Sequence, residues 1–123
     1  MSVQTAVSQL EQALDRLSWS PNRQLEHLQR FGLGPDELAL DFDDSYRVVA
    51  ALVSRGALPL DVAAPLQHVD SLLAEMTDGT DAHWTGEAVA QSPQWARLRR
   101  TSREALDSLR AAAPSDEASG RET

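Results

Sequence analysis

The spacing of apolar residues constrains the fold of this chain more than any other feature of its sequence. Near the start, apolar residues recur at alternating steps of four and three: Val3, Val7, Leu10, Leu14 and Leu17. The same steps recur over residues 62–76. Such steps place side chains on one face of an α-helix, whereas a half-buried strand alternates every second residue. The pattern therefore predicts amphipathic helices that bury one face against each other.

Serine–proline pairs and a glycine indicate where several of these helices begin and end. A serine accepts hydrogen bonds from the first helical turn and proline suits its first position, so Ser20-Pro21 and Ser92-Pro93 predict two helix starts. Gly32 predicts a helix end, because glycine adopts the left-handed conformation at little cost. We expect helices at residues 3–18, 21–31, 35–55, 60–76 (or from Ala64), 86–91 and 93–112.

These segments predict an all-α, single-domain bundle of five or six short helices. The bundle is expected to occupy residues 1–113, since a chain of 123 residues is long enough to bury one core. Residues 114–123 have no apolar periodicity and are expected to form a disordered tail. The segment 35–55 is expected either to be buried on more than one side or to break near residues 43–45. Residues 48–53 could form a buried strand, but their place inside a longer helical pattern favours a helix.

The charge of the chain is negative and unevenly distributed. The formal net charge is −8, and residues 31–95 contain eleven acidic residues but only two arginines. This balance argues against nucleic acid and against anionic membranes as partners, because both attract basic side chains. Residues 96–110 are net positive, and we expect this basic helix to lie against the acidic middle of the chain. Without a signal peptide or a bilayer-length apolar run, the chain is expected to be cytoplasmic.

The densest polar cluster lies at the start of the third helix: Asp36, Glu37, Asp41, Asp43 and Asp44. Glu37, Asp41 and Asp44 would share one helical face, because they lie four and then three residues apart. A solvated helix face is the ordinary interpretation of such a run. Its functional interpretations are a docking surface for a basic partner or a Mg²⁺ or Ca²⁺ site, although the glycine and alternating ligands of a calcium loop are absent.

No catalytic signature accompanies this cluster. The chain has no cysteine and no lysine, which excludes thiolate catalysis, Schiff-base lysines and the lysine of a phosphate-binding loop. The histidines, His27, His68 and His83, are isolated and match no metal-binding or hydrolase motif. We therefore expect no catalytic residue, no metal and no cofactor. Among the tryptophans, Trp95 is expected in the core, whereas Trp84 is a candidate for partner binding.

Two stretches of the sequence carry a resemblance to known proteins. One runs from Asp36 to Asp44, and the other from Trp84 through Ser92-Pro93-Gln94-Trp95 to Arg99, with Ala105-Leu106 beyond. Together they resemble a poorly characterised group of small helical bacterial proteins, the immunity-like partners of secreted toxins. The resemblance covers residues 8–110. It implies a cytoplasmic binding protein and carries over no catalytic residue.

The sequence thus predicts a non-catalytic protein-binding module, such as an immunity-type inhibitor that docks a basic toxin or enzyme. The expected contact residues are Glu37, Asp41, Asp43, Asp44 and Trp84, since acidic positions complement a basic partner. One alternative is a small helical enzyme or metal-binding protein that uses Glu37, Asp41, Asp44 and a histidine. Another is a regulatory homodimer that uses leftover apolar surface on the helices at 3–18 or 62–76.

Overall fold

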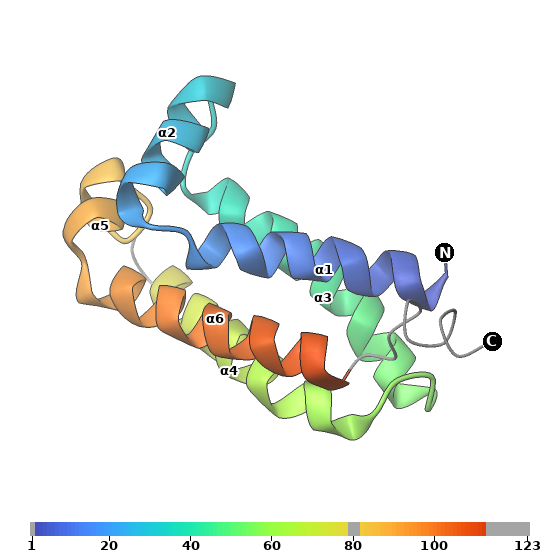
Figure 1. Cartoon of the computed structure of the whole chain (residues 1–123). Coiled ribbons are helices and arrows are strands. Elements are labelled where there is room, and N and C mark those ends of the chain that lie inside the picture. Colours follow the sequence, from blue (N-terminus) through green and yellow to red (C-terminus); the bar gives the residue numbers. More distant parts are fainter. Residues whose placement is uncertain (1, 79–81, 113–123) are drawn as a thin grey trace.

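The computed structural model describes residues 2–78 and 82–112 (Figure 1). Within these residues all regular secondary structure is helical, with no strand, so the predicted all-α class is confirmed. The predicted tail at 114–123 lies outside the described residues. The elements in chain order are α1 Val3–Ser18, α2 Pro21–Phe31, α3 Asp36–Ser54, the 3-10 turn η1 Leu60–Val62, α4 Ala63–Thr77, α5 Gly86–Gln91 and α6 Pro93–Ala112.

The helix boundaries follow from local hydrogen-bonding chemistry. The Ser20 hydroxyl accepts from the backbone N–H of Arg23 at 3.3 Å, and the Ser92 hydroxyl accepts from that of Gln94 at 3.1 Å. Both serines therefore cap the helices that the serine–proline pairs predict. Gly32 ends α2 in the left-handed conformation, with φ of 64°. At this position a side chain would be strained, which is why glycine stands there.

Helix α3 is continuous, so the break considered near residues 43–45 does not occur. Arg47 donates from Nε to Asp43 Oδ2 at 2.9 Å, one turn apart, which supports the helix across this region. Residues 48–53 are helical rather than extended. Helix α4 starts at Ala63 after η1, so Pro65 falls in the first turn, where its missing N–H breaks no helical hydrogen bond.

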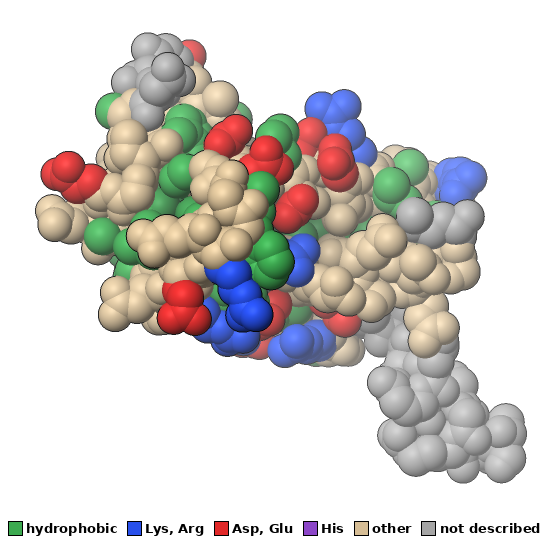
Figure 2. All heavy atoms as spheres, turned by 90° about the horizontal axis from the view of Figure 1, so that it is seen from above, with side chains coloured by type: hydrophobic (Ala, Val, Ile, Leu, Met, Phe, Trp, Pro, Cys, Tyr) green, Lys and Arg blue, Asp and Glu red, His purple; other side chains and the backbone are tan. Residues whose placement is uncertain are grey.

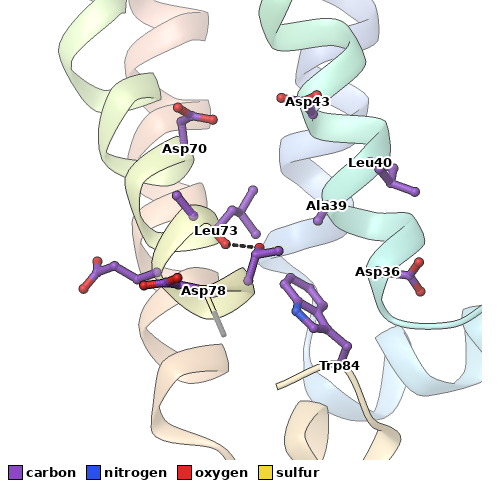
Figure 3. A pocket seen from close by; sticks show the side chains of 11 residues that line it. Asp36, Ala39, Leu40, Asp43, Asp70, Leu73, Asp78 and Trp84 are labelled. Carbon is purple, nitrogen blue, oxygen red and sulfur yellow. Dashed lines mark hydrogen bonds between the residues drawn. The ribbon is translucent and has the colours of Figure 1, made fainter. Parts of the chain in front are cut away.

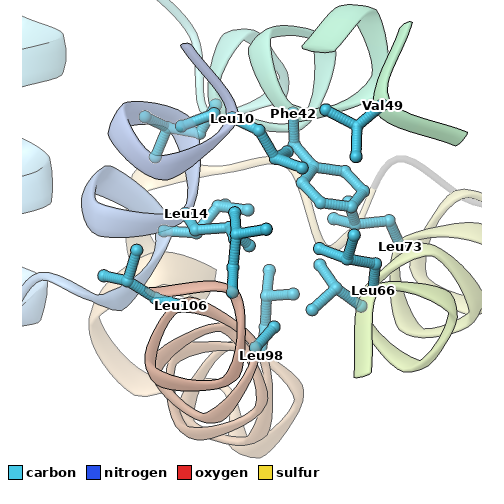
Figure 4. Packing of buried hydrophobic residues seen from close by; sticks show 14 of the residues in the cluster. Leu10, Leu14, Phe42, Val49, Leu66, Leu73, Leu98 and Leu106 are labelled. Atoms are coloured by element: carbon cyan, nitrogen blue, oxygen red, sulfur yellow. The ribbon is translucent and has the colours of Figure 1, made fainter. Parts of the chain in front are cut away.

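Four helices, α1, α3, α4 and α6, surround one core. Helix α1 packs against α3 and α6, and α6 packs against α4 (Figure 1). The predicted α1 stripe lies in this core: Val7, Leu10, Leu14 and Leu17 are all buried. Figure 4 shows side chains from all four helices meeting around Phe42, which is fully buried. Trp95 is fully buried as well, as expected from its position on α6.

The four-helix arrangement is closed on three sides and open on the fourth. Helices α3 and α4 contact each other far less than the pairs α1–α3, α1–α6 and α4–α6 do. Bundle helices bury their apolar stripes by packing against two neighbours, so a weak pair leaves part of its facing surface accessible. This open seam between α3 and α4 lies on the side of the bundle away from α1 and α6 (Figure 3).

Helix α2 stands outside the bundle and packs on α5 (Figure 1). Gln24, which is fully buried, attaches α2 to its neighbours. Its Nε2 donates to the backbone carbonyls of Arg16 and Leu17, each at 3.0 Å, and its Oε1 accepts from Arg99 Nη1 at 2.9 Å. The side chain therefore joins α1, α2 and α6 at one point.

Helix α6 lies against part of the acidic middle of the chain, as expected, because it packs on η1, α4 and α5. The expected charge pairing between them is not found. Among the described residues, no carboxylate forms an ion pair with an α6 arginine. The reason is geometric, because α6 packs between α1 and α4, away from the acidic start of α3. Arg99 is the α6 arginine that points inward, and it donates to the neutral oxygens of Gln24 and Val89. Burial lowers the pKa of its guanidinium. In the described part of the chain no helix has the length and apolarity needed to cross a bilayer.

Candidate functional site

The open seam between α3 and α4 forms a groove of about 1060 Å³. Figure 3 shows Trp84 at one end of it, with its ring pointing between the two helices. Ala39 and Leu73 line the floor, while Asp43 and Asp70 lie opposite each other on α3 and α4. The complete lining is Asp36, Ala39, Leu40, Asp43, Asp70, Leu73, Ala74, Glu75, Thr77, Asp78 and Trp84.

Helical periodicity explains why acidic and apolar residues alternate along the groove. On α3, Asp36, Ala39 and Asp43 are three and then four residues apart, so they lie along the same side of the helix. On α4, Asp70, Leu73 and Thr77 have the same spacing. The Thr77 hydroxyl donates to the backbone carbonyl of Leu73, one turn earlier on α4 (Figure 3). Each helix therefore contributes apolar floor between carboxylates.

The groove is strongly negative. Among the described residues its one ion pair is between Asp43 and Arg47, and both of these side chains are partly solvent-exposed. No cation pairs with the carboxylates of Asp36, Asp70 or Asp78 in this part of the chain. Uncompensated carboxylates around a partly apolar cleft concentrate negative potential there. The groove is therefore suited to a positively charged ligand.

Tyr46 reports the same environment beside the groove. Its ring stacks on Phe42 with a centroid distance of 5.2 Å, and the side chain is half-buried. Burial raises the pKa of the phenol, and the negative charge of Asp70 raises it further. The direction of this shift agrees with a low-dielectric, negative surrounding.

Trp84 is fixed in place from below by Trp95. The two rings meet edge to face with centroids 5.8 Å apart. Trp95 itself is anchored, because its Nε1 donates to the backbone carbonyl of His83 at 2.7 Å. Trp84 remains half-buried, so part of its ring is available at the end of the groove. A rigid, partly exposed tryptophan is a common anchor in protein interfaces.

The structure divides the acidic cluster that the sequence treated as one surface. Asp43 lines the groove, as does Trp84. Glu37, Asp41 and Asp44 do not line it. Asp41 instead faces α1, where its Oδ2 is 3.9 Å from Arg16 Nη2. Asp41 and Asp43 are two positions apart, and a helix turns by about 200° over two positions, so their side chains point in different directions.

Sequence reasoning missed most of the acidic residues in the groove. Asp36 was part of the predicted acidic cluster but not among the expected contact residues. Asp70 and Glu75 are isolated acids on α4, and Asp78 directly follows the end of that helix. The available signal was the spacing of Asp70, Leu73 and Thr77 on α4. That spacing indicates a groove only once α3 is known to lie beside α4.

The residues considered for a metal site are not brought together. Within residues 2–78 and 82–112, no three side chains among histidine, cysteine, aspartate and glutamate are placed to hold a metal ion. His27 lies on α2 and His68 is exposed on α4, so neither lines the groove. The groove's own lining contains no histidine, cysteine or lysine. The groups it offers are carboxylates, a hydroxyl and apolar surface.

The apolar surface left exposed differs from that expected for a homodimer. The stripes on α1 and α4 are buried in the core, so the leftover surface expected on those helices is not found. The exposed large apolar side chains are on α2, α3, η1 and the turn after α2: Phe31 at 60%, Leu33 at 38%, Leu40 at 50%, Val48 at 36% and Leu60 at 77%. Leu40 belongs to the groove.

Comparisons with protein-family models, with curated proteins and with solved structures found no match to this chain. The resemblance to immunity-like bacterial proteins therefore stays a prediction. The features of the molecule that bear on its function are the groove and the charges around it.

Proposed function

We propose that this chain is a non-catalytic protein-binding module that holds a basic, amphipathic helix of a partner protein in the groove between α3 and α4. The observation that carries the proposal is the open seam of the bundle. There the floor is apolar, the rims are acidic, and the carboxylates of Asp36, Asp70 and Asp78 have no cationic partner in the described part of the chain.

A helix is the shape that the seam accepts most readily. In a closed bundle, the space above two parallel or antiparallel helices is covered by another helix. An added helix could place its apolar face on Ala39, Leu73 and the Trp84 ring. Its basic side chains would then reach Asp43 on one rim and Asp70 on the other. Helix-in-groove recognition combines these two kinds of contact, one for affinity and one for orientation.

The overall charge supports a basic partner. A net charge of −8 attracts a positively charged protein from a distance and accelerates encounter. An inhibitor of a basic toxin or enzyme would benefit from this acceleration, because it must bind before its target acts. We therefore propose that this chain is an immunity-type inhibitor whose partner is a basic toxin or enzyme. Its contact surface is the groove rather than the single acidic helix face expected from the sequence.

A defined peptide tests the proposal directly. The probe is a synthetic helical peptide with leucines on one face and arginines on the other, titrated calorimetrically into the full chain. The groove variant combines Asp43→Asn with Asp70→Asn. Each exposed charge contact is worth up to about 1 kcal/mol, so the double variant should bind about tenfold more weakly. Raising the salt concentration should weaken binding to the wild-type chain.

The matched control removes the same charge outside the groove, through Glu37→Gln with Asp44→Asn. This control should bind the peptide as the wild type does, apart from a small effect of net charge. Equal weakening by both double variants would mean that the peptide responds to overall charge and that the groove is not its site. The absence of any binding at low salt would count against the proposal as a whole.

A further inference from the structure

A second surface of the molecule carries positive charge, whereas the groove is negative. We define the α2 face as Trp19, Arg23, His27, Arg30 and Phe31. Its rings form a connected series, with centroid distances of 5.4 Å from Trp19 to His27 and 5.0 Å from His27 to Phe31. The Arg23 guanidinium lies over the Trp19 ring, 3.9 Å from its centroid. These contacts hold the side chains in a fixed arrangement.

Most of the α2 face is exposed, although Trp19 and His27 are half-buried and the Trp19 indole N–H donates to Asp15 Oδ2 at 3.1 Å. Phe31 is 60% exposed, and Arg23 and Arg30 are both exposed. Neither arginine pairs with a carboxylate among the described residues. Helix α2 stands away from the four-helix bundle and touches α5 through its other side (Figure 1). A basic and aromatic helix face is thus left without a partner on an acidic protein.

We propose that a second copy of this chain covers this face, with α2 of one copy lying in the groove between α3 and α4 of the other. The inference rests on the proposed function, because it uses the same groove. The helix that occupies the groove is α2 of a second copy. Helix α2 is an example of the basic, amphipathic helix that the groove is built to hold.

The spacing of charges on the two surfaces matches. Arg23 and Arg30 are seven residues apart on α2, and Asp36 and Asp43 are seven residues apart on α3. At 1.5 Å per helical residue, each pair is separated by about 10.5 Å along its helix. Both arginines can therefore face both aspartates at once when the two helices run side by side. Opposite charges aligned in this way favour one register over others.

The apolar parts of the two surfaces also correspond. Phe31 follows Arg30 directly, so it lies near one charged end of the α2 face. In the dimer it could contact the apolar floor of the other copy's groove, formed by Ala39, Leu73 and the Trp84 ring. Leu40, half-exposed on the groove, would lose its contact with water in the same step. Exposed apolar groups on both sides are the usual source of association free energy.

Figure 2 views the molecule from above Figure 1 and shows both acidic and basic side chains on that side. A contact that joins a patch of one sign on one copy to a patch of the other sign on the next can be made twice in a two-fold dimer. In such a dimer each copy inserts its α2 into the other. The dimer would occupy both grooves and so would compete with a partner helix.

Sedimentation velocity on the full chain tests this pairing through a charge exchange. One variant reverses the α2 face through Arg23→Glu with Arg30→Glu, and the other reverses the rim through Asp36→Arg with Asp43→Arg. The wild type should sediment near twice 13.4 kDa at low salt and shift toward 13.4 kDa at high salt. Each variant alone should remain at the monomer mass. Mixed in equal amounts, the two variants should recover the dimer, since the reversed charges are again opposite.

The test includes a control variant and a pair of single substitutions that perturb the fold less. Arg97→Glu with Arg100→Glu reverses the same charge on the outer side of α6 and should leave the dimer intact. If circular dichroism shows that a double variant is unfolded, the single changes Arg30→Glu and Asp43→Arg replace it in the same mixing design. Dimer loss in the α6 control, or dimers that persist in both reversed variants, would overturn the proposed interface. A mixture that stays monomeric would do the same.

The peptide experiment separates this inference from the proposed function. A wild-type chain that is monomeric at its highest soluble concentration in low salt, yet binds the leucine–arginine peptide, refutes self-association and leaves the groove function standing. A dimer that passes the charge exchange but is not dissociated by the peptide supports the self-contact and counts against a heterologous partner helix. Dissociation of the dimer by the peptide supports both.

Discussion

Replacing Gln24 with alanine removes a single side chain on which the position of α2 depends. Gln24 is fully buried, and its side chain makes three hydrogen bonds to other helices. Two of these go to the backbone carbonyls of Arg16 and Leu17 in the last turn of α1, where carbonyls lack the usual helical partners. The Arg16 carbonyl also accepts from the backbone N–H of Trp19 at 3.3 Å. The third ties α2 to the partly buried guanidinium of Arg99 on α6.

The expected loss of stability can be worked out from these bonds. A neutral hydrogen bond contributes about 1 kcal/mol net, and one to a charged group contributes about 1.5–3 kcal/mol. Two neutral bonds and one charged bond therefore sum to about 3–5 kcal/mol. In the variant, Arg99 would keep only its bond to the Val89 carbonyl, at 3.1 Å, which leaves its charge less well satisfied. Against a typical total stability of about 5–15 kcal/mol, this loss is severe.

Urea unfolding followed by far-ultraviolet circular dichroism measures the effect. Gln29→Ala is the matched control, because Gln29 is exposed on the same helix and its side chain makes no hydrogen bond to another element within residues 2–78 and 82–112. The control should change the free energy of unfolding by less than about 0.5 kcal/mol. A loss below about 1 kcal/mol for Gln24→Ala would show that the three bonds do not attach α2 as described. The double variant with Arg99→Ala should lose less than the sum of the two single changes, because the pair interacts directly.

Three further predictions concern other parts of the molecule. Phe42→Ala should lower the free energy of unfolding by about 3–5 kcal/mol in the same urea experiment, because it opens a cavity at the centre of the bundle. Gly32→Ala should cost about 1 kcal/mol and lower the melting temperature, since φ of 64° strains any side chain there. Tyr46 is the only tyrosine, so an ultraviolet pH titration reports it alone, and its midpoint should lie above the ordinary 10.0 and fall in Asp70→Asn. Because the folded-state pKa is raised, this group's stabilising contribution is present below pH 10 and is lost as the pH rises through the folded pKa.

The helices could be predicted because their signals are local. Steps of four and three identify an amphipathic helix from its own residues, and a capping serine needs only the next turn of its own chain. Ser20 and Gly32 act in the structure as their residue types indicate. From the sequence, a break in α3 near residues 43–45 was an alternative. No proline or glycine interrupts this segment, and it forms one continuous helix.

The candidate site could be predicted only in part, because it belongs to two helices. Asp43 and Trp84 were identified, but Asp41 was grouped with Asp43 although their side chains point in different directions. Asp70 gave no signal, since a single acid on the polar side of a helix is ordinary. The expected pairing of the α6 arginines with the acidic segment failed for a related reason. Helix α6 does pack on η1, α4 and α5, but net charge per segment does not say which side chains face each other.

The sequence by itself determined the all-helical class, the helix boundaries and the apolar stripes, because each depends on residues within a few positions of one another. Tertiary structure alone decided that α3 and α4 meet weakly and leave an open seam. It also decided that α2 stands apart with its basic face uncovered (Figure 1). Both outcomes depend on how the apolar stripes of the four helices pack together in one core. That packing depends on contacts between side chains far apart along the chain. The charge and shape of the groove follow from it.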